Sequence, residues 1–322
     1  MKDLASQLKQ VKTVAIAGHV KPDGDCVGSC LATYNYIAAW FPQIEVDLYL
    51  EPIPNIFKFL KNADKICHCC EGNQAYDLCI VQDCGDTGRL GGAVKYFDTA
   101  RKTICIDHHI SNASFADENY IFPEASSTSE LIFDLIEEER ITPEIAECIY
   151  VGMIHDTGVF QYSSTSSKTM RAAGILMDKG IDFSKIVDET FFAKTYGQNK
   201  ILGQALLNSE LYLEGQVIAT VITQEEMDRY QVKARHLEGI VSQLRVTKGV
   251  EAAIFLYENE DGTWKVSMRS NGRVDVARIA MNHGGGGHVR AAGATLEGAP
   301  KERIGEICEE IKEQLQAQAL EG

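Results

Sequence analysis

Four segments of the chain contain aspartate and histidine in patterns that suit metal-ion binding. The candidate ligands and their neighbours are His19, Asp23, Asp25, Asp83, Asp107, His108, His109 and Asp156. Each segment alone has an ordinary explanation, because Asp-Gly-Asp is often a turn and an aspartate after a strand often caps a helix. Together, these oxygen and nitrogen donors suit hard, roughly octahedral cations, with manganese first and magnesium, iron or cobalt next. Two such ions about 3.5–4 Å apart would clamp a phosphate and generate a hydroxide between them.

Short apolar runs predict the elements that would bring these segments together. We expect strands over residues 14–17, 46–50, 78–81 and 103–106. A helix is expected over 27–40, and another begins at Ser127, with Glu130 completing a capping-box spacing. This alternation predicts a parallel sheet covered on both faces. Ligands bind beyond the carboxyl ends of the strands in such a sheet, so the four segments would meet there.

The second half of the chain has a different pattern. We expect strands over residues 211–213, 217–222, 252–257 and 263–269. Residues 260–262 (Glu-Asp-Gly) would turn the last two into a hairpin, with Arg269 on the polar face. The chain is therefore divided into a first domain over 1–187, a helical linker over 188–210 and a second domain over 211–322.

A run of four glycines, Gly284–Gly287, precedes His288 in the second half. The backbone N–H groups of such a loop can approach an anion closely and form a nest. Arg269 and His288 would add hydrogen-bond donors, helped by Arg273 and Arg290. A flexible glycine hinge is the weaker alternative, because histidines and arginines bracket the run.

Composition narrows the class of protein. The length of 322 residues favours two domains, and 45% of the residues are apolar, enough for a core in each. A formal net charge of −15 disfavours binding to long nucleic acid. We expect a cytoplasmic protein, since the N-terminus has no apolar signal core and no segment approaches membrane-spanning length. Residues 67–70 (Cys-His-Cys-Cys) are too crowded for the usual zinc spacing, and we expect packing roles for most of the ten cysteines.

The motifs resemble those of the DHH phosphoesterase superfamily and of its associated C-terminal domain. The first set is His19-x3-Asp23-x-Asp25, Asp83, Asp107-His108-His109 and Asp156; the second is the glycine run with His288, followed by Ala291-Ala292-Gly293. The resemblance spans nearly the whole chain and is greatest for the branch of nano-RNases and pAp (3′-phosphoadenosine 5′-phosphate) phosphatases.

The resemblance implies roles for individual residues. One metal ion would be held by His19, Asp23, Asp83 and Asp156. The other would be held by Asp25, Asp83, His108 and Asp156, so that Asp83 and Asp156 would bridge. His109 would lie beside the substrate phosphate as a hydrogen-bond donor or proton source, with Asp107 orienting its loop. The substrate-binding residues would be Arg269, Arg273, Gly285, Gly286, Gly287 and His288. His155 has no role in the motif, and we expect a structural one.

The resemblance also implies a fold and an activity. The fold is α/β with two domains, a parallel-sheet DHH domain and a smaller mixed-sheet α/β domain, with the active site in the cleft between them. The activity is metal-dependent hydrolysis of the P–O3′ bond of short nucleotides, through in-line attack by a hydroxide held between two Mn²⁺ ions. The ligands would be short oligonucleotides, pAp or di-adenosine nucleotides, with no long nucleic acid and no membrane, and a homodimer is possible.

Three other functions stay open at this point. A cyclic di-AMP or pApA phosphodiesterase would break the same bond and is the strongest alternative. Inorganic pyrophosphatase shares the metal motifs but gives no reason for the glycine run. A nucleotide-binding regulator without catalysis is disfavoured, because the ligand set is intact.

Overall fold

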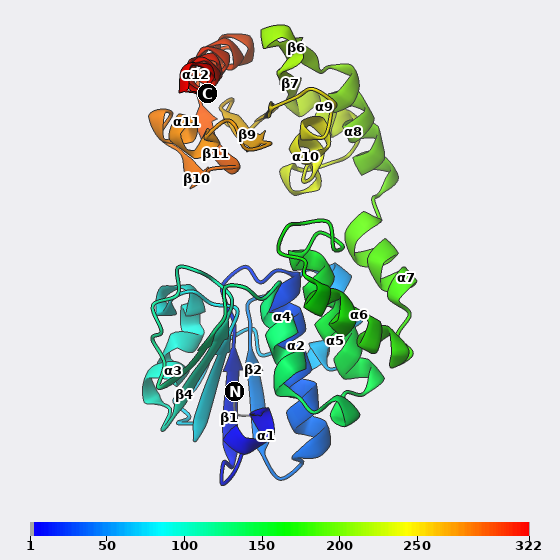
Figure 1. Ribbon diagram of the computed structural model, residues 1–322, viewed down its shortest axis with the longest axis vertical. Coiled ribbons are helices and arrows are strands. Elements are labelled where there is room, and N and C mark those ends of the chain that lie inside the picture. Colours follow the sequence, from blue (N-terminus) through cyan, green and yellow to red (C-terminus); the bar gives the residue numbers. More distant parts are fainter. Residues whose placement is uncertain (1–2, 322) are drawn as a thin grey trace. The chain divides into compact units, whose positions relative to one another are not determined.

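The computed structural model of the protein describes residues 3–321 and divides into two compact units (Figure 1). The first unit ends at Ala193 and the second begins at Lys194. Both are α/β, which confirms the predicted fold class. No helix within residues 3–321 is both long and apolar enough to cross a bilayer.

The first unit is built on a five-stranded sheet in which every pairing is parallel. In spatial order β2-β1-β3-β4-β5, its strands are Glu45–Tyr49, Thr13–Ala17, Leu78–Gln82, Thr103–Asp107 and Glu118–Ile121. The first four confirm the predicted strands. The fifth was not predicted, because its half-buried Glu-Asn-Tyr-Ile sequence has too little apolar character to stand out.

Helices cover both faces of this sheet (Figure 1). They are α1 (Leu4–Gln7), α2 (Gly24–Trp40), α3 (Val94–Thr99), α4 (Thr128–Leu135), α5 (Pro143–Asp156), α6 (Ser167–Asp178) and α7 (Phe183–Val187). Short helical turns η1 to η4 and the π-helix η5 are Asn55–Phe57, Ala63–Lys65, Thr87–Ala93, Glu138–Arg140 and Asp188–Phe192. One core cluster joins Ile16 and Ile80 to α2, α4 and α5, and another joins Ala15 and Val81 to Tyr96 of α3. Alternate residues of each strand thus face opposite layers.

The start of α4 differs in one detail from the predicted capping box. The Ser127 hydroxyl accepts from the backbone N–H of Glu130 at 3.0 Å, as expected. The Glu130 carboxylate, however, accepts from the hydroxyls of Ser126 and Thr169 at 2.6 and 2.7 Å. This acidic side chain is buried, and it is satisfied by the hydroxyls of two separate segments together with Lys168 Nζ at 3.2 Å.

The second unit has a mixed six-stranded sheet in the spatial order β10-β11-β9-β8-β7-β6. Its strands are β6 (Glu210–Tyr212), β7 (Val217–Ile222), β8 (Ala252–Glu258), β9 (Trp264–Ser270), β10 (Gly286–His288) and β11 (Ala291–Leu296). The helices are α8 (Tyr196–Leu207), α9 (Gln224–Arg229), α10 (Ile240–Arg245), α11 (Val276–Asn282) and α12 (Pro300–Glu321), with short turns η6 and η7 at Leu213–Gly215 and Ala234–His236. The alternation predicted for β9 is confirmed, because Trp264, Val266 and Met268 are buried. The predicted domain boundaries at residues 187 and 211 stay a prediction.

Candidate metal centre and anion-binding surface

Three parallel strands deliver candidate ligands to one edge of the first sheet. His19 follows β1, Asp83 follows β3 directly, and His108 directly follows Asp107, the last residue of β4. Parallel strands place their carboxyl ends at the same edge, so these residues meet. Helix ends complete the set: Asp23 caps the start of α2 and Asp156 is the last residue of α5.

Asp83 lies at the middle of the cluster and presents its two oxygens in different directions. Its Oδ2 is 3.5 Å from His19 Nε2, and its Oδ1 is 3.7 Å from His108 Nε2. His19 Nε2 is also 3.7 Å from Asp23 Oδ1, and His108 Nε2 is 3.0 Å from Asp156 Oδ2. The two oxygens of the Asp83 carboxylate therefore face different imidazoles, one that of His19 and the other that of His108.

Asp25 is fully buried and held by the start of α4. Its Oδ2 accepts from the backbone N–H of Thr128 at 2.7 Å, and its Oδ1 accepts from that of Ser129 at 2.9 Å. Gly152 of α5 makes room, because a Cβ there would lie 2.7 Å from Asp25 Oδ1 and 1.9 Å from Ser129 Oγ. These two backbone donors were not predicted from the sequence. The available signal was the Ser-Thr-Ser run that caps and begins α4, since a helix N-terminus stabilises a carboxylate.

His109 is oriented by its neighbours. Its Nδ1 donates to Asp107 Oδ1 at 2.7 Å, and Asn112 Nδ2 donates to Asp107 Oδ2 at 2.7 Å. The hydrogen bond to Asp107 raises the pKa of His109, against the opposing effect of burial. Because Nδ1 is engaged, Nε2 is the ring nitrogen left for a ligand, and the side chain is 35% exposed. Asn112, which sequence reasoning also missed, carries no motif signal of its own.

The backbone of Asp83 has a φ of 52°, in the left-handed region. Aspartate tolerates this region better than most residues, but the conformation still costs free energy. Such backbone conformations concentrate at functional sites, where the surrounding structure enforces them. The residue with the most central carboxylate thus also has a strained backbone.

Burial and mutual proximity decide the protonation of the cluster. Burial raises the pKa of Asp25 well above its ordinary value, and the carboxylates of Asp83 and Asp156 raise it further. Burial also raises the pKa of Asp83. Burial opposes a charge on His108, but its hydrogen bond to Asp156 and the nearby carboxylates raise its pKa to about 10. The carboxylates thus favour positive charge beside them, which protons or metal cations can supply.

The residues present fit divalent cations. Within the described residues, potential ligand atoms of Asp25, His108 and Asp156 lie within 4.8 Å of one another, as do those of Asp83, His108 and His109. Carboxylates with imidazoles are a donor set for manganese, iron or cobalt. Pairwise distances of 3.0 to 3.9 Å, each from His19 or His108, link all six expected ligands, His19, Asp23, Asp25, Asp83, His108 and Asp156.

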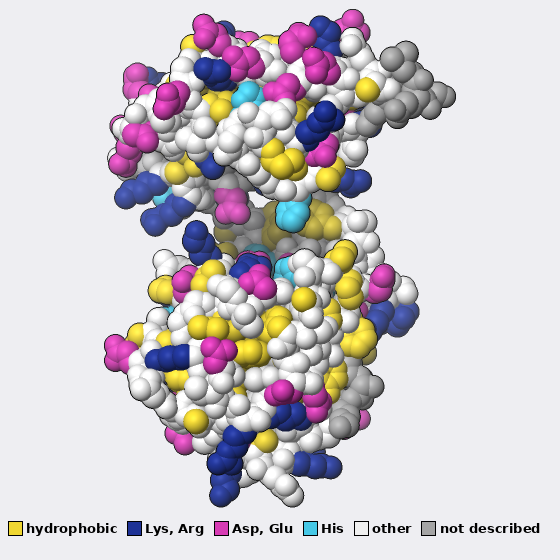
Figure 2. Space-filling view, turned by 90° about the vertical axis from the view of Figure 1, so that its left-hand side faces the viewer, with side chains coloured by type: hydrophobic (Ala, Val, Ile, Leu, Met, Phe, Trp, Pro, Cys, Tyr) yellow, Lys and Arg dark blue, Asp and Glu magenta, His cyan; other side chains and the backbone are white. Residues whose placement is uncertain are grey.

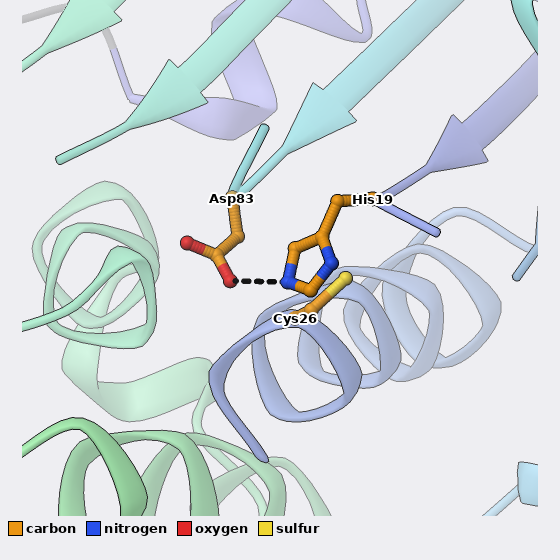
Figure 3. A group of neighbouring side chains, drawn as sticks. All are labelled: His19, Cys26 and Asp83. Atoms are coloured by element: carbon orange, nitrogen blue, oxygen red, sulfur yellow. Dashed lines mark ion pairs between the residues drawn. The ribbon is translucent and has the colours of Figure 1, made fainter. Parts of the chain in front are cut away.

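A thiol not counted as a ligand lies in the same cluster. Figure 3 shows Cys26 beside the ring of His19, which faces Asp83. Cys26 and Cys84 are both fully buried, so they fill space, and burial raises the pKa of Cys84 to about 12. The His68 ring of the crowded cysteine segment hydrogen-bonds to the carbonyl of Leu50, and this segment forms no metal-type group within residues 3–321.

In the second unit, the candidate substrate-binding residues lie on neighbouring strands. His288 of β10 pairs with Ala291 of β11, which pairs with Arg269 of β9. Directly opposed residues share a face of a sheet. The small Ala291 therefore lies between two side chains, those of His288 and Arg269, that can donate hydrogen bonds to an anion. Arg290 lies against Gly272, which is next to Arg273. Figure 2 shows Lys and Arg side chains gathered along one edge of this unit.

The glycines of the run differ in how much space lies beside their Cα atoms. A Cβ at Gly285 would lie 2.1 Å from the carbonyl oxygen of Gly293, and one at Gly287 would lie 2.5 Å from that of Ala291. These two glycines are required by close packing against β11. Gly286 differs, because a Cβ there would meet nothing within 4 Å. Of these three residues, only Gly286 has open space beside its Cα.

The chain matches two family models in succession. Residues 13–153 match the DHH family, N-terminal domain, and residues 214–317 match the DHHA1 domain.

Curated relatives match over almost their full lengths. The chain is 29% identical to the bifunctional oligoribonuclease and PAP phosphatase NrnA of Thermus thermophilus, over 98% of this chain and 94% of that protein. It is 27% identical to the Bacillus subtilis protein of the same name, over 91% and 92%. A crystal structure of an exopolyphosphatase-related protein from Bacteroides fragilis is 27% identical, with a TM-score of 0.87 over 97% of this chain and 96% of that one. The chain therefore contains a DHH-family N-terminal domain followed by a DHHA1 domain.

Proposed function

We propose that the protein hydrolyses the P–O3′ bond of short nucleotides that carry a 5′-phosphate. Its substrates would be RNA of a few nucleotides, shortened by one 5′-nucleotide at a time, and pAp, converted to AMP. The observation that carries the proposal is the placement of His19 and His108 on the two oxygens of Asp83, in a site built from acids and imidazoles. The names of the relatives point to the same pair of substrates.

Divalent cations, for which we propose two manganese ions, would be held by His19, Asp23, Asp25, Asp83, His108 and Asp156. When bound, such ions withdraw charge from phosphate oxygens and make water a better nucleophile at neutral pH. Asp83, with an oxygen on each side, would be shared, and we propose the same for Asp156. The backbone donors of α4 keep Asp25 in place without using a flexible side chain.

His109 is the candidate proton donor. Hydrolysis leaves a negative charge on the O3′ leaving group, which a nearby N–H can stabilise or neutralise. Asp107 engages Nδ1 and holds the ring, so Nε2 is the atom that would donate to a phosphate oxygen or to O3′. This pairing of an imidazole with a buried carboxylate keeps one tautomer and one orientation.

The second unit would bind the non-reacting end of the substrate. Arg269 and His288 offer donors on one face of the sheet, and Gly286 allows a phosphate to approach the loop closely. Arg273, Gly285 and Gly287 would complete the loop environment. A site that holds one terminal phosphate gains little binding energy from additional nucleotides. This would explain a preference for short substrates. The cytoplasmic location and the homodimer stay predictions.

A substrate panel with added Mn²⁺ tests the proposal. It comprises pAp, pApA, cyclic di-AMP, RNA from two to about ten nucleotides, and pyrophosphate. We expect release of phosphate from pAp and of mononucleotides from the shortest RNAs at the highest kcat/KM. Faster cleavage of cyclic di-AMP or pApA would reassign the substrate class, and turnover of pyrophosphate alone would overturn the proposal.

A further inference from the structure

His155 lies immediately before the candidate ligand Asp156 and is enclosed by aromatic rings. The centroid of its ring is 4.9 Å from that of Phe57, at 81°, and 5.7 Å from that of Phe191, at 63°. Sequence reasoning gave this residue a structural role only, but its contacts reach both the ligand loop and the end of the first unit.

On one side, the ring packs directly against the ligand loop. Gly24 lies between Asp23 and Asp25, and a Cβ at this position would be 2.4 Å from His155 Cγ. No real side chain at residue 24 could be accommodated at that distance without a shift. The imidazole therefore packs against the backbone that joins Asp23 to Asp25. The backbone of His155 itself continues directly into Asp156.

On the other side, the ring is hydrogen-bonded to a π-helix. His155 Nε2 is 3.1 Å from Thr190 Oγ1, and the Thr190 hydroxyl donates to the carbonyl of Ile186 at 2.8 Å. The hydroxyl proton is thus committed, and Nε2–H is the donor to Thr190. Thr190 belongs to η5, which ends one residue before Ala193, the last residue of the first unit. Single π-helical turns are rare and occur often at functional sites.

We propose that His155 is a positioning residue that couples η5, the segment leading into the second unit, to the spacing of Asp23, Asp25 and Asp156. A movement of η5 would reach the ligands through one hydrogen bond and one close ring–backbone contact. This coupling rests on the proposed function, in which those three residues hold metal ions. It gives the chain a physical route by which the position of the linker changes cation affinity.

The test is Thr190→Val, which removes the hydroxyl without touching a candidate ligand. We expect Mn²⁺ binding, measured by isothermal titration calorimetry, to weaken about threefold to tenfold, the size of one lost hydrogen bond behind a ligand. The kcat on pAp should fall by a similar factor with KM unchanged. Thr220→Val is the matched control, because Thr220 is also buried and its hydroxyl donates to the carbonyl of Ala205 at 2.7 Å in the other unit.

Variants of His155 complete a double-mutant cycle. His155→Phe combined with Thr190→Val should bind Mn²⁺ no more weakly than His155→Phe alone, and His155→Gln, which keeps an N–H donor, should recover part of the affinity. Mn²⁺ affinity and kcat equal to wild type in Thr190→Val, with only thermal stability lowered as in Thr220→Val, would overturn the coupling. A wild type that binds Mn²⁺ but hydrolyses no nucleotide would overturn the proposed function. The coupling would still be tested by the Mn²⁺ affinities of the Thr190 and His155 variants. A wild type that binds no Mn²⁺ would overturn both.

Discussion

The candidate metal centre of the first unit and the glycine-loop face of the second unit, which carries Arg269, Gly286 and His288, are built in opposite ways. At the metal centre, Asp25 and Asp83 are 0% and 2% exposed, and fixed neighbours hold them. On the glycine-loop face, His288 and Gly286 are exposed. Groups that stabilise a transition state work best when preorganised and shielded from water, whereas groups that capture a ligand must reach it in solvent. The two regions should therefore respond differently to substitution.

The largest effect is expected at the two acids proposed to serve both ions, the buried Asp83 and the partly exposed Asp156. Asp83→Ala and Asp156→Ala should each reduce kcat/KM on pAp by at least about a thousandfold at saturating Mn²⁺, because each removes a ligand proposed to serve both ions. Asp23→Ala should cost less, since Asp23 serves one ion. The control is Asp98→Asn on the exposed surface of α3. Near-normal rates in the Asp83 or Asp156 variant would end the two-metal assignment.

A smaller and more selective loss is expected on the glycine-loop face. Arg269→Ala and His288→Ala should lower kcat/KM for pAp about tenfold to a hundredfold, the size of one charge-assisted phosphate contact. Hydrolysis of bis-p-nitrophenyl phosphate, which has no 5′-phosphate, should change far less, and Mn²⁺ affinity should stay the same. Lys265→Ala, on the same face of β9, is the control. Equal losses on both substrates would remove the distinction between the two regions.

Two neighbouring glycines separate packing from recognition within the second region. Gly285→Ala should lower the free energy of unfolding by about 1–3 kcal/mol, because its Cβ collides with the backbone of β11. Gly286→Ala should leave the melting temperature unchanged and raise KM for pAp, because its Cβ projects into open space. Thermal denaturation and steady-state kinetics of both variants check this. Similar melting temperatures for the two variants would show that packing of the loop against β11 is not what requires glycine at residue 285.

The smallest effect concerns pH and the metal-free protein. The pKa of His108 is raised from 6.5 to about 10, so its stabilising contribution is complete below pH 6.5 and is lost as pH rises toward 10. The pKa values of Asp25 and Asp83 are also raised, so these two groups likewise lower the stability of the metal-free protein as pH rises. EDTA-treated protein should melt a few degrees lower at pH 8.5 than at pH 6.5, and added Mn²⁺ should raise the melting temperature more at pH 8.5. A metal-induced increase that shrinks with pH would contradict this protonation scheme.

Much of the first unit was predictable because its signals are local. Three of the four predicted strands, β1, β3 and β4, are largely buried and appear as short apolar runs, and each is followed within two residues by a ligand-type side chain. The carboxyl-end rule for parallel sheets then brings His19, Asp83 and His108 together without further information. The boundaries of these strands differ from the prediction by one residue at most, since few other assignments bury the same apolar side chains.

Other features were decided only by the tertiary structure. The sequence by itself determined which residues could bind cations or anions, because residue type and spacing along a strand or loop are local properties. It could not show that the α4 N-terminus holds Asp25, that Gly152 makes room for it, or that His155 joins Gly24 to Thr190. It also could not separate Gly285 from Gly286, since the difference lies in whether another strand occupies the space beside each Cα. These contacts join segments that are distant in sequence. They are determined by tertiary packing and not by the secondary-structure propensity of each segment.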